Sequence, residues 1–139
     1  MANAFIRTRD DYAALVMRLF LGVVFFGHGA QKVLGWWGGP GARGTIQVFA
    51  KAGLPPVVSV LIMAAEFGGA LLLFIGFLTR LAAIGIGCVM VAAILMVHSK
   101  VGFFMNWFGN QKGEGYEYHL LAVALCIALL ITGGGAFSV

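Results

Sequence analysis

Long apolar stretches separated by short polar segments dominate the pattern of this chain. Four such stretches predict helices at about residues 12–35, 57–78, 80–98 and 118–135. About 20 helical residues cross the hydrocarbon of a bilayer, because each residue advances a helix by about 1.5 Å. The first two stretches reach this length, whereas the third is marginal and the fourth is short. Tilt or local thinning of the bilayer is therefore expected around the last two.

Glycine and proline residues mark the ends of these stretches. The segment 36–41 reads Trp-Trp-Gly-Gly-Pro-Gly and ends the first helix, and Pro55-Pro56 opens the second, since proline is tolerated at a helix start. The tight connection at 76–79 predicts that the second and third helices form an antiparallel hairpin. Three glycines at 133–135 end the fourth helix.

The composition identifies the surroundings of these helices. Of the 139 residues, 61% are hydrophobic and only 10% are charged, whereas soluble domains contain about a quarter of charged residues. This number of charged residues is too small to cover the surface of a protein surrounded by water. The apolar surface is therefore expected to face lipid. The chain is predicted to be one domain, residues 1–139, an all-α integral membrane protein built as a four-transmembrane-helix bundle. Nucleic acid is not an expected partner, because the lysines and arginines are scattered singly.

Four spans place both termini on one side of the membrane. The longer connections, at about 36–56 and 98–117, lie together on the other side, which we call the loop side. Basic residues divide almost evenly between the two sides, with Arg7 and Arg9 on the terminal side, so the positive-inside rule leaves the orientation open. The aromatic segment 103–108 is expected to lie in the membrane interface or to cap the bundle.

Glu66 is the most informative ionisable residue. It lies about nine residues into the second helix, or roughly 13 Å below the loop-side boundary. A charge at mid-membrane costs about 2.5–3.5 kcal/mol. Glu66 is therefore protonated, paired with a cation or accessible to water, and its structural alternative is a buried pair that locks the bundle. Lys32 either extends to the interface or reaches towards Glu66.

Other polar residues converge on the loop side. His28 and Lys32 are four residues apart on one face of the first helix, His98 closes the third, and Glu117 and His119 open the fourth. If they face inward, they line a polar pocket inside the bundle. The alternative is that His98 and His119 face lipid headgroups at the helix ends.

Two kinds of chemistry fit such a pocket. Three histidines and a glutamate are acceptable ligands for zinc, copper or non-haem iron, but their spacing matches no compact motif. The favoured interpretation is a site for a quinone, whose carbonyls need hydrogen-bond partners and a proton donor. Glu66 and His119 are the predicted catalytic residues that handle protons, and His28 and Lys32 are predicted to hold the ring.

Two arginines and two cysteines complete the set of notable residues. Arg18 lies about two turns inside the first helix and Arg80 begins the third, both towards the terminal side. Each either extends to the headgroups, which is favoured for Arg80, or binds an anion, a headgroup or a partner.

Cys88 and Cys126 lack a Cys-x-x-Cys partner and are interpreted as inert thiols, with an intramembrane disulfide as the alternative.

Three segments, taken in order, resemble the DoxX family. Residues 18–32 contain Arg-Leu-x-x-Gly followed by Gly-His-Gly-x-x-Lys, and residues 66–80 read Glu-x-Gly-Gly-x-Leu-Leu-Leu-x-x-Gly-x-x-Thr-Arg. Residues 113–121, Gly-Glu-Gly-Tyr-Glu-Tyr-His-Leu-Leu, resemble the opening of the last family helix. The resemblance implies a multi-pass bundle in a prokaryotic inner membrane and an association with thiosulfate:quinone oxidoreductase or oxidative-stress complexes. The positions it carries over are Arg18, Lys32, Glu66, Arg80, Glu117 and His119.

The predicted function follows from the pocket and the resemblance together. The chain is expected to be a membrane subunit of an oxidoreductase that binds a quinone or a similar lipid-soluble redox molecule, with a partner subunit or a second copy of itself. It carries no haem-attachment motif, dinucleotide fingerprint or iron–sulfur cysteine set, so its electrons must come from elsewhere. A small proton-linked transporter and a non-catalytic assembly protein are the alternatives. The predicted ligand-binding residues are Arg18, His28, Lys32, Arg80, His98 and Glu117.

Overall fold

The computed structural model describes residues 11–139, and this part of the chain is helical without strands. Arg7 and Arg9, which entered the topology argument, lie outside the described residues. A π-helical turn, Ala64–Gly68, joins α4 and α5 into one helix, and short 3-10 turns follow α2 and α6. The α-helices are α2 (Tyr12–Val33), α3 (Gly41–Lys51), α4 (Pro56–Met63), α5 (Gly69–Ile75), α6 (Thr79–Met96) and α7 (Glu117–Thr132).

Three helical segments are long and apolar enough to cross a membrane. They are Tyr12–Val33, Pro56–Ile75 and Thr79–Lys100, and α7 is apolar but shorter, with 16 residues. The prediction of an all-α membrane protein is confirmed, and the fourth span stays a prediction. The second and fourth helices end three residues before their predicted ends (75 against 78, and 132 against 135), because Gly76 and Gly133 adopt positive φ angles there.

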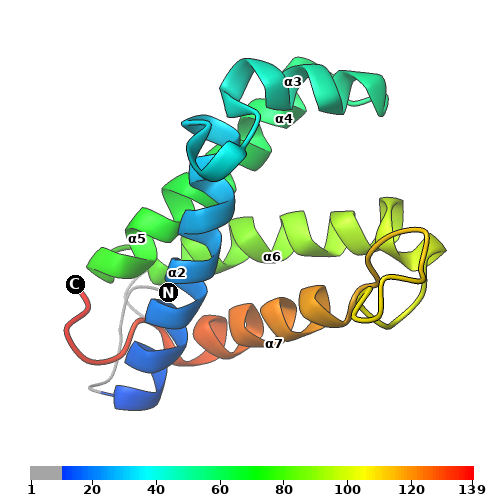
Figure 1. Cartoon of the computed structure of the whole chain (residues 1–139). Helices are drawn as coiled ribbons and strands as arrows, with labels where there is room; N and C mark the ends of the chain where they lie inside the picture. Colours follow the sequence, from blue (N-terminus) through cyan, green and yellow to red (C-terminus); the bar gives the residue numbers. More distant parts are fainter. Residues whose placement is uncertain (1–10) are drawn as a thin grey trace.

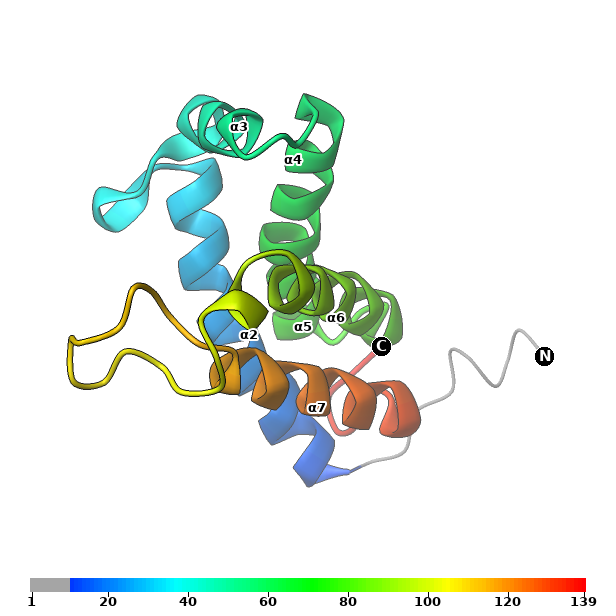
Figure 2. The same cartoon turned by 90° about the vertical axis from the view of Figure 1, so that its right-hand side faces the viewer.

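The helices form two pairs that share one core. Figure 1 shows α2 beside α4 and α5, whereas α6 and α7 form a second pair that runs across the first. The pairs meet near the described C-terminus and spread apart towards the loop side, as the turned view in Figure 2 also shows. The helices α2, α5, α6 and α7 each contribute a fully buried side chain to this core, namely Phe25, Leu73, Ile86 and Leu129.

The helix α3 lies within the segment 36–56, for which the sequence predicts a loop. Its sequence is amphipathic: Thr45 is buried, whereas Arg43 and Gln47 are exposed. The Thr45 hydroxyl donates a hydrogen bond to the backbone oxygen of Lys32 at 3.0 Å. This bond fixes α3 across the loop-side end of α2. The sequence does not predict α3 because glycine and proline, which precede it, usually indicate loops.

Close contact between α2 and the π-helical turn requires a glycine. A Cβ atom at Gly29 would lie 2.7 Å from the Cα of Phe67, whereas one at Gly27 would meet nothing within 4 Å. We expect Gly29→Ala to lower the free energy of unfolding by about 1–3 kcal/mol, as overpacking does. Gly27→Ala is the matched control and should keep or raise stability, because alanine favours helices. Equal melting temperatures of the two variants in detergent would contradict this packing.

Candidate functional site

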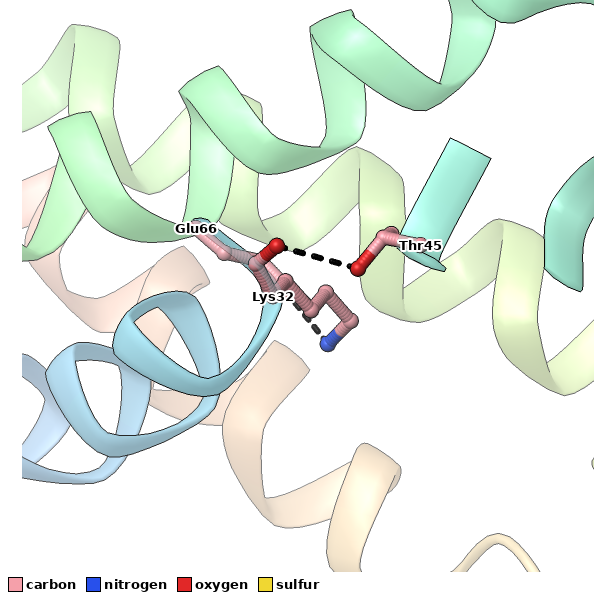
Figure 3. A network of polar contacts seen from close by, with 3 residues as sticks. All are labelled: Lys32, Thr45 and Glu66. Carbon is pink, nitrogen blue, oxygen red and sulfur yellow. Dashed lines mark hydrogen bonds and ion pairs between the residues drawn. The ribbon is translucent and has the colours of Figure 1, made fainter. Parts of the chain in front are cut away.

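Lys32 and Glu66 form a buried ion pair between α2 and the π-helical turn. The lysine Nζ lies 2.6 Å from the carboxylate Oε2 (Figure 3). The Glu66 side chain is 4% exposed and that of Lys32 is 23% exposed. The structure therefore adopts the alternative in which Lys32 reaches Glu66. Because the Lys32 backbone also accepts the hydrogen bond from Thr45, one residue ties α2, α3 and the π-helical turn together.

An open pocket of about 620 Å³ lies on the loop side, between α2 and the beginning of α7. Its volume falls in the range of about 300–1,000 Å³ that is usual for small-molecule sites. Its walls are mostly apolar, with few polar groups. We call it the loop-side pocket, and its lining residues are His28, Phe103, Met105, Trp107, Glu117, Tyr118, Leu120 and Leu121.

Three residues of the connection between α6 and α7, namely Phe103, Met105 and Trp107, line one side of this pocket, and we call this connection the roof. The Glu117 carboxylate accepts hydrogen bonds from the backbone N–H of Met105, at 3.3 Å, and from the indole N–H of Trp107. The Glu117 backbone N–H also donates to the carbonyl of Phe103 at 2.9 Å. Glu117 thus anchors the connection onto the first turn of α7. The aromatic segment 103–108 contributes residues to the lining of the pocket. Its predicted place in the membrane interface or as a cap of the bundle stays a prediction.

An aromatic group forms the inner wall of the loop-side pocket. The Tyr118 ring lies 5.9 Å from the His28 ring and 6.5 Å from the Phe25 ring, measured between centroids. The Tyr118 hydroxyl is buried and has no hydrogen-bond partner within residues 11–139. Buried polar groups are nearly always paired, so this hydroxyl is an exception among the described residues. Sequence reasoning missed Tyr118, although its position between Glu117 and His119 was a usable signal.

His98 and His119 lie next to each other but do not line the loop-side pocket. Their ring centroids are 4.0 Å apart, and the Tyr118 ring meets His119 edge-on at 4.9 Å. His98 Nδ1 lies 2.8 Å from the backbone oxygen of Glu114, whereas the buried Nδ1 of His119 has no partner among the described residues. His119 therefore sits directly behind the pocket wall. Its predicted role in proton handling and the ligand role of His98 stay predictions.

The described residues give the metal alternative no support. Within residues 11–139, no three side chains of His, Cys, Asp or Glu form a group that could hold a metal ion. His28 and His119 each contact the Tyr118 ring, at 5.9 Å and 4.9 Å between centroids. Cys88 is exposed and Cys126 is buried, and both are free thiols.

Arg18 lies at the other end of the molecule from the loop-side pocket. Its side chain is 1% exposed, so it does not extend to the headgroups. All three guanidinium nitrogens donate hydrogen bonds to backbone carbonyls at 2.7–3.1 Å, and the acceptors are Leu73, Phe74, Gly134 and Ala136. Arg18 thereby joins the end of α5 to the C-terminal segment. Its assignment as a ligand-binding residue stays a prediction.

Arg80 lies near Arg18 in the fold and also donates to backbone carbonyls. Its Nε lies 2.8 Å from the oxygen of Leu130, in the last turn of α7. A cation at this position complements the negative end of the α7 dipole. The eight predicted site residues therefore occupy different places: His28 and Glu117 line the pocket, Lys32 and Glu66 form a pair, His98 and His119 stack, and the arginines lie on the terminal side.

Together, these features define a small helical membrane protein with a roofed pocket on one side. The sequence profile of the DoxX family matches residues 13–99. "Putative oxidoreductase CatD" of Bacillus subtilis is 32% identical over 119 residues, which cover 86% of this chain and 79% of that protein. "Inner membrane protein YqjF" of Escherichia coli is 28% identical over 130 residues, covering 94% of this chain and 91% of that protein. No solved structure matches. The chain belongs to the DoxX family, as the sequence motifs predicted.

Proposed function

We propose that this chain is the membrane subunit of an oxidoreductase and that the loop-side pocket binds a quinone or a similar lipid-soluble redox molecule. The observation that carries the proposal is the roofed, mostly apolar pocket of about 620 Å³ with the few polar groups that a quinone ring needs. The name of the Bacillus relative, "Putative oxidoreductase CatD", favours the reaction class. The name of the Escherichia relative, "Inner membrane protein YqjF", favours the cytoplasmic membrane as its location.

We also propose that α7 is the fourth span. Its 16 residues extend over about 24 Å, which is short of the roughly 30 Å of hydrocarbon. Its N-terminal end carries the roof and its C-terminal end carries the segment bound by Arg18. Both ends are thus held by protein contacts, and modest bilayer thinning would accommodate the difference.

The chemistry assigns distinct roles to the polar groups. Reduction of a quinone to a quinol consumes two electrons and two protons, and a partner oxidoreductase subunit supplies the electrons. The His28 ring is the donor best placed for a quinone carbonyl, since it lines the pocket, whereas the Tyr118 hydroxyl is buried and its ring forms part of the wall. His119 lies behind Tyr118 and His98 lies behind His119, so this row is the proposed path of protons from the loop side.

Binding of a water-soluble quinone analogue to the purified protein in nanodiscs tests the proposal. We expect saturable binding to the parent and an affinity about tenfold lower for His28→Leu, since a hydrogen bond worth about 1.4 kcal/mol is lost. His98→Leu is the matched control: it removes a histidine outside the pocket lining and should keep the affinity of the parent. Absence of saturable binding to the folded parent would refute the proposal, and equal losses in both variants would refute the role of His28.

A further inference from the structure

One wall of the loop-side pocket is also part of the outer surface of α7. Leu120 and Leu121 line the pocket, and Leu121 is nevertheless 69% exposed. Leu120 shares its exposed helix face with Ile127 and Ile131, at spacings that place them on one stripe. In a membrane protein an exposed apolar stripe faces lipid. The pocket is therefore open sideways, towards the acyl chains.

The polar and apolar parts of the pocket lie at different depths. Glu117 holds the roof at the first turn of α7, and Leu121 follows four residues later, which is about 6 Å further along the helix. The polar partner is the His28 ring, which lies 5.9 Å from the Tyr118 ring between centroids, whereas Leu121 belongs to the exposed apolar edge of the pocket. A molecule that satisfies both parts has a polar ring and an apolar tail attached to it.

We infer that the ligand of the loop-side pocket is a long-tailed amphiphile that enters sideways from the hydrocarbon, between His28 and Leu121. Its polar ring lies under the roof against His28 and Tyr118, and its tail leaves the protein over Leu120 and Leu121. The roof formed by residues 103–107 separates the ring from water on the loop side. This inference rests on the proposed function and specifies the class of quinone: one with a tail, taken up from the membrane.

Two quinones with the same ring, one with a methyl group and one with a ten-carbon tail, test the inference in nanodiscs. Dissociation constants are expressed as mole fractions of quinone in the bilayer. A tail that moves from lipid to another apolar site gains little free energy, so this scale removes the effect of partitioning into the membrane. We expect Leu121→Trp to weaken binding of the tailed quinone about tenfold or more, since the indole blocks the tail, and to change the methyl form by less than about twofold. Ile131→Trp makes a similar change on the same lipid-facing side, outside the pocket, and should affect neither.

The outcomes separate this inference from the proposal beneath it. If the parent binds both quinones and Leu121→Trp weakens both equally or neither, sideways access fails and the quinone site stands. If the folded parent binds neither quinone saturably, for example because a phospholipid chain fills the pocket, both fail. Leu120→Trp provides a second obstruction of the same edge, so the test does not depend on the folding of a single variant.

Discussion

Replacing Arg18 by lysine is expected to lower the free energy of unfolding by about 3 kcal/mol or more. Lysine keeps the charge but has one nitrogen, whereas the guanidinium uses three nitrogens to satisfy four backbone carbonyls, three of them in buried bonds. Each carbonyl left unpaired in an apolar interior costs about 1–3 kcal/mol. The loss should be concentrated where Arg18 joins α5 to the C-terminal segment, because the carbonyls of Gly134 and Ala136 lose their donors.

Thermal unfolding together with hydrogen exchange measures this effect. The backbone N–H of Ala136 donates to Asp11 and that of Val139 donates to Gly76, so both amides should exchange faster in Arg18→Lys. Arg43→Lys, which makes the same change at an exposed position of α3, should match the parent. A melting temperature of Arg18→Lys equal to that of Arg43→Lys would show that the buried guanidinium does not hold the fold together.

The second large effect is an asymmetry between the two partners of the ion pair. We expect Lys32→Met to cost about 3 kcal/mol, because it leaves the almost fully buried Glu66 carboxylate without its cation. Glu66→Gln should cost only about 1 kcal/mol, since the partly exposed Lys32 side chain can extend towards the interface instead. The loss of stability is larger for Lys32→Met than for Glu66→Gln because the Glu66 side chain is less exposed than that of Lys32.

A double-mutant cycle measures this asymmetry. The double variant Lys32→Met/Glu66→Gln should be more stable than Lys32→Met alone, because no charge is then left unpaired. Lys51→Met, at an exposed position, is the control for removing a lysine. Additive losses would exclude coupling between the two side chains. Unchanged quinone affinity of Glu66→Gln would assign Glu66 to the structural lock that the sequence offered as its alternative, and would remove it from proton handling.

The membrane class and most helix positions follow from the sequence because they depend on local properties. An apolar run of about 20 residues indicates a transmembrane helix by its length alone. Gly76 and Gly133 supply the positive φ angles that end α5 and α7. The pairing of Lys32 with Glu66 was one of the alternatives derived from depth alone. A buried carboxylate needs a cation, and Lys32 approaches from the same side of the membrane.

The features that sequence reasoning missed depend on tertiary contacts. The partners of Arg18 in the C-terminal segment lie more than a hundred residues away in sequence, and no local pattern points to a backbone acceptor. The π-helical turn around Glu66 has no sequence signal that we recognise. Tyr118 was not among the predicted site residues, because only the arrangement of the helices brings its ring against His28.

The expected single polar pocket is only partly present for a related reason. The order of the predicted spans placed the polar residues on the same side of the membrane but did not fix the angle between the helix pairs. In the structure, the pairs spread apart on this side, so His28 and Glu117 line the pocket, while Lys32 turns to Glu66 and His98 turns to His119. Fewer polar groups are thus available to the ligand than the sequence suggested, and the Tyr118 ring is added to the pocket wall.

Photolabelling with a quinone that carries a diazirine on its ring, followed by mass spectrometry, tests most directly whether the loop-side pocket holds a quinone. The protein is labelled in nanodiscs with and without an excess of the unmodified quinone. We predict adducts around His28 in α2 and at residues 118–121 in α7 that the excess quinone suppresses. Adducts spread over the lipid-facing sides of the helices, with no suppression by competitor, would contradict a quinone site in this pocket.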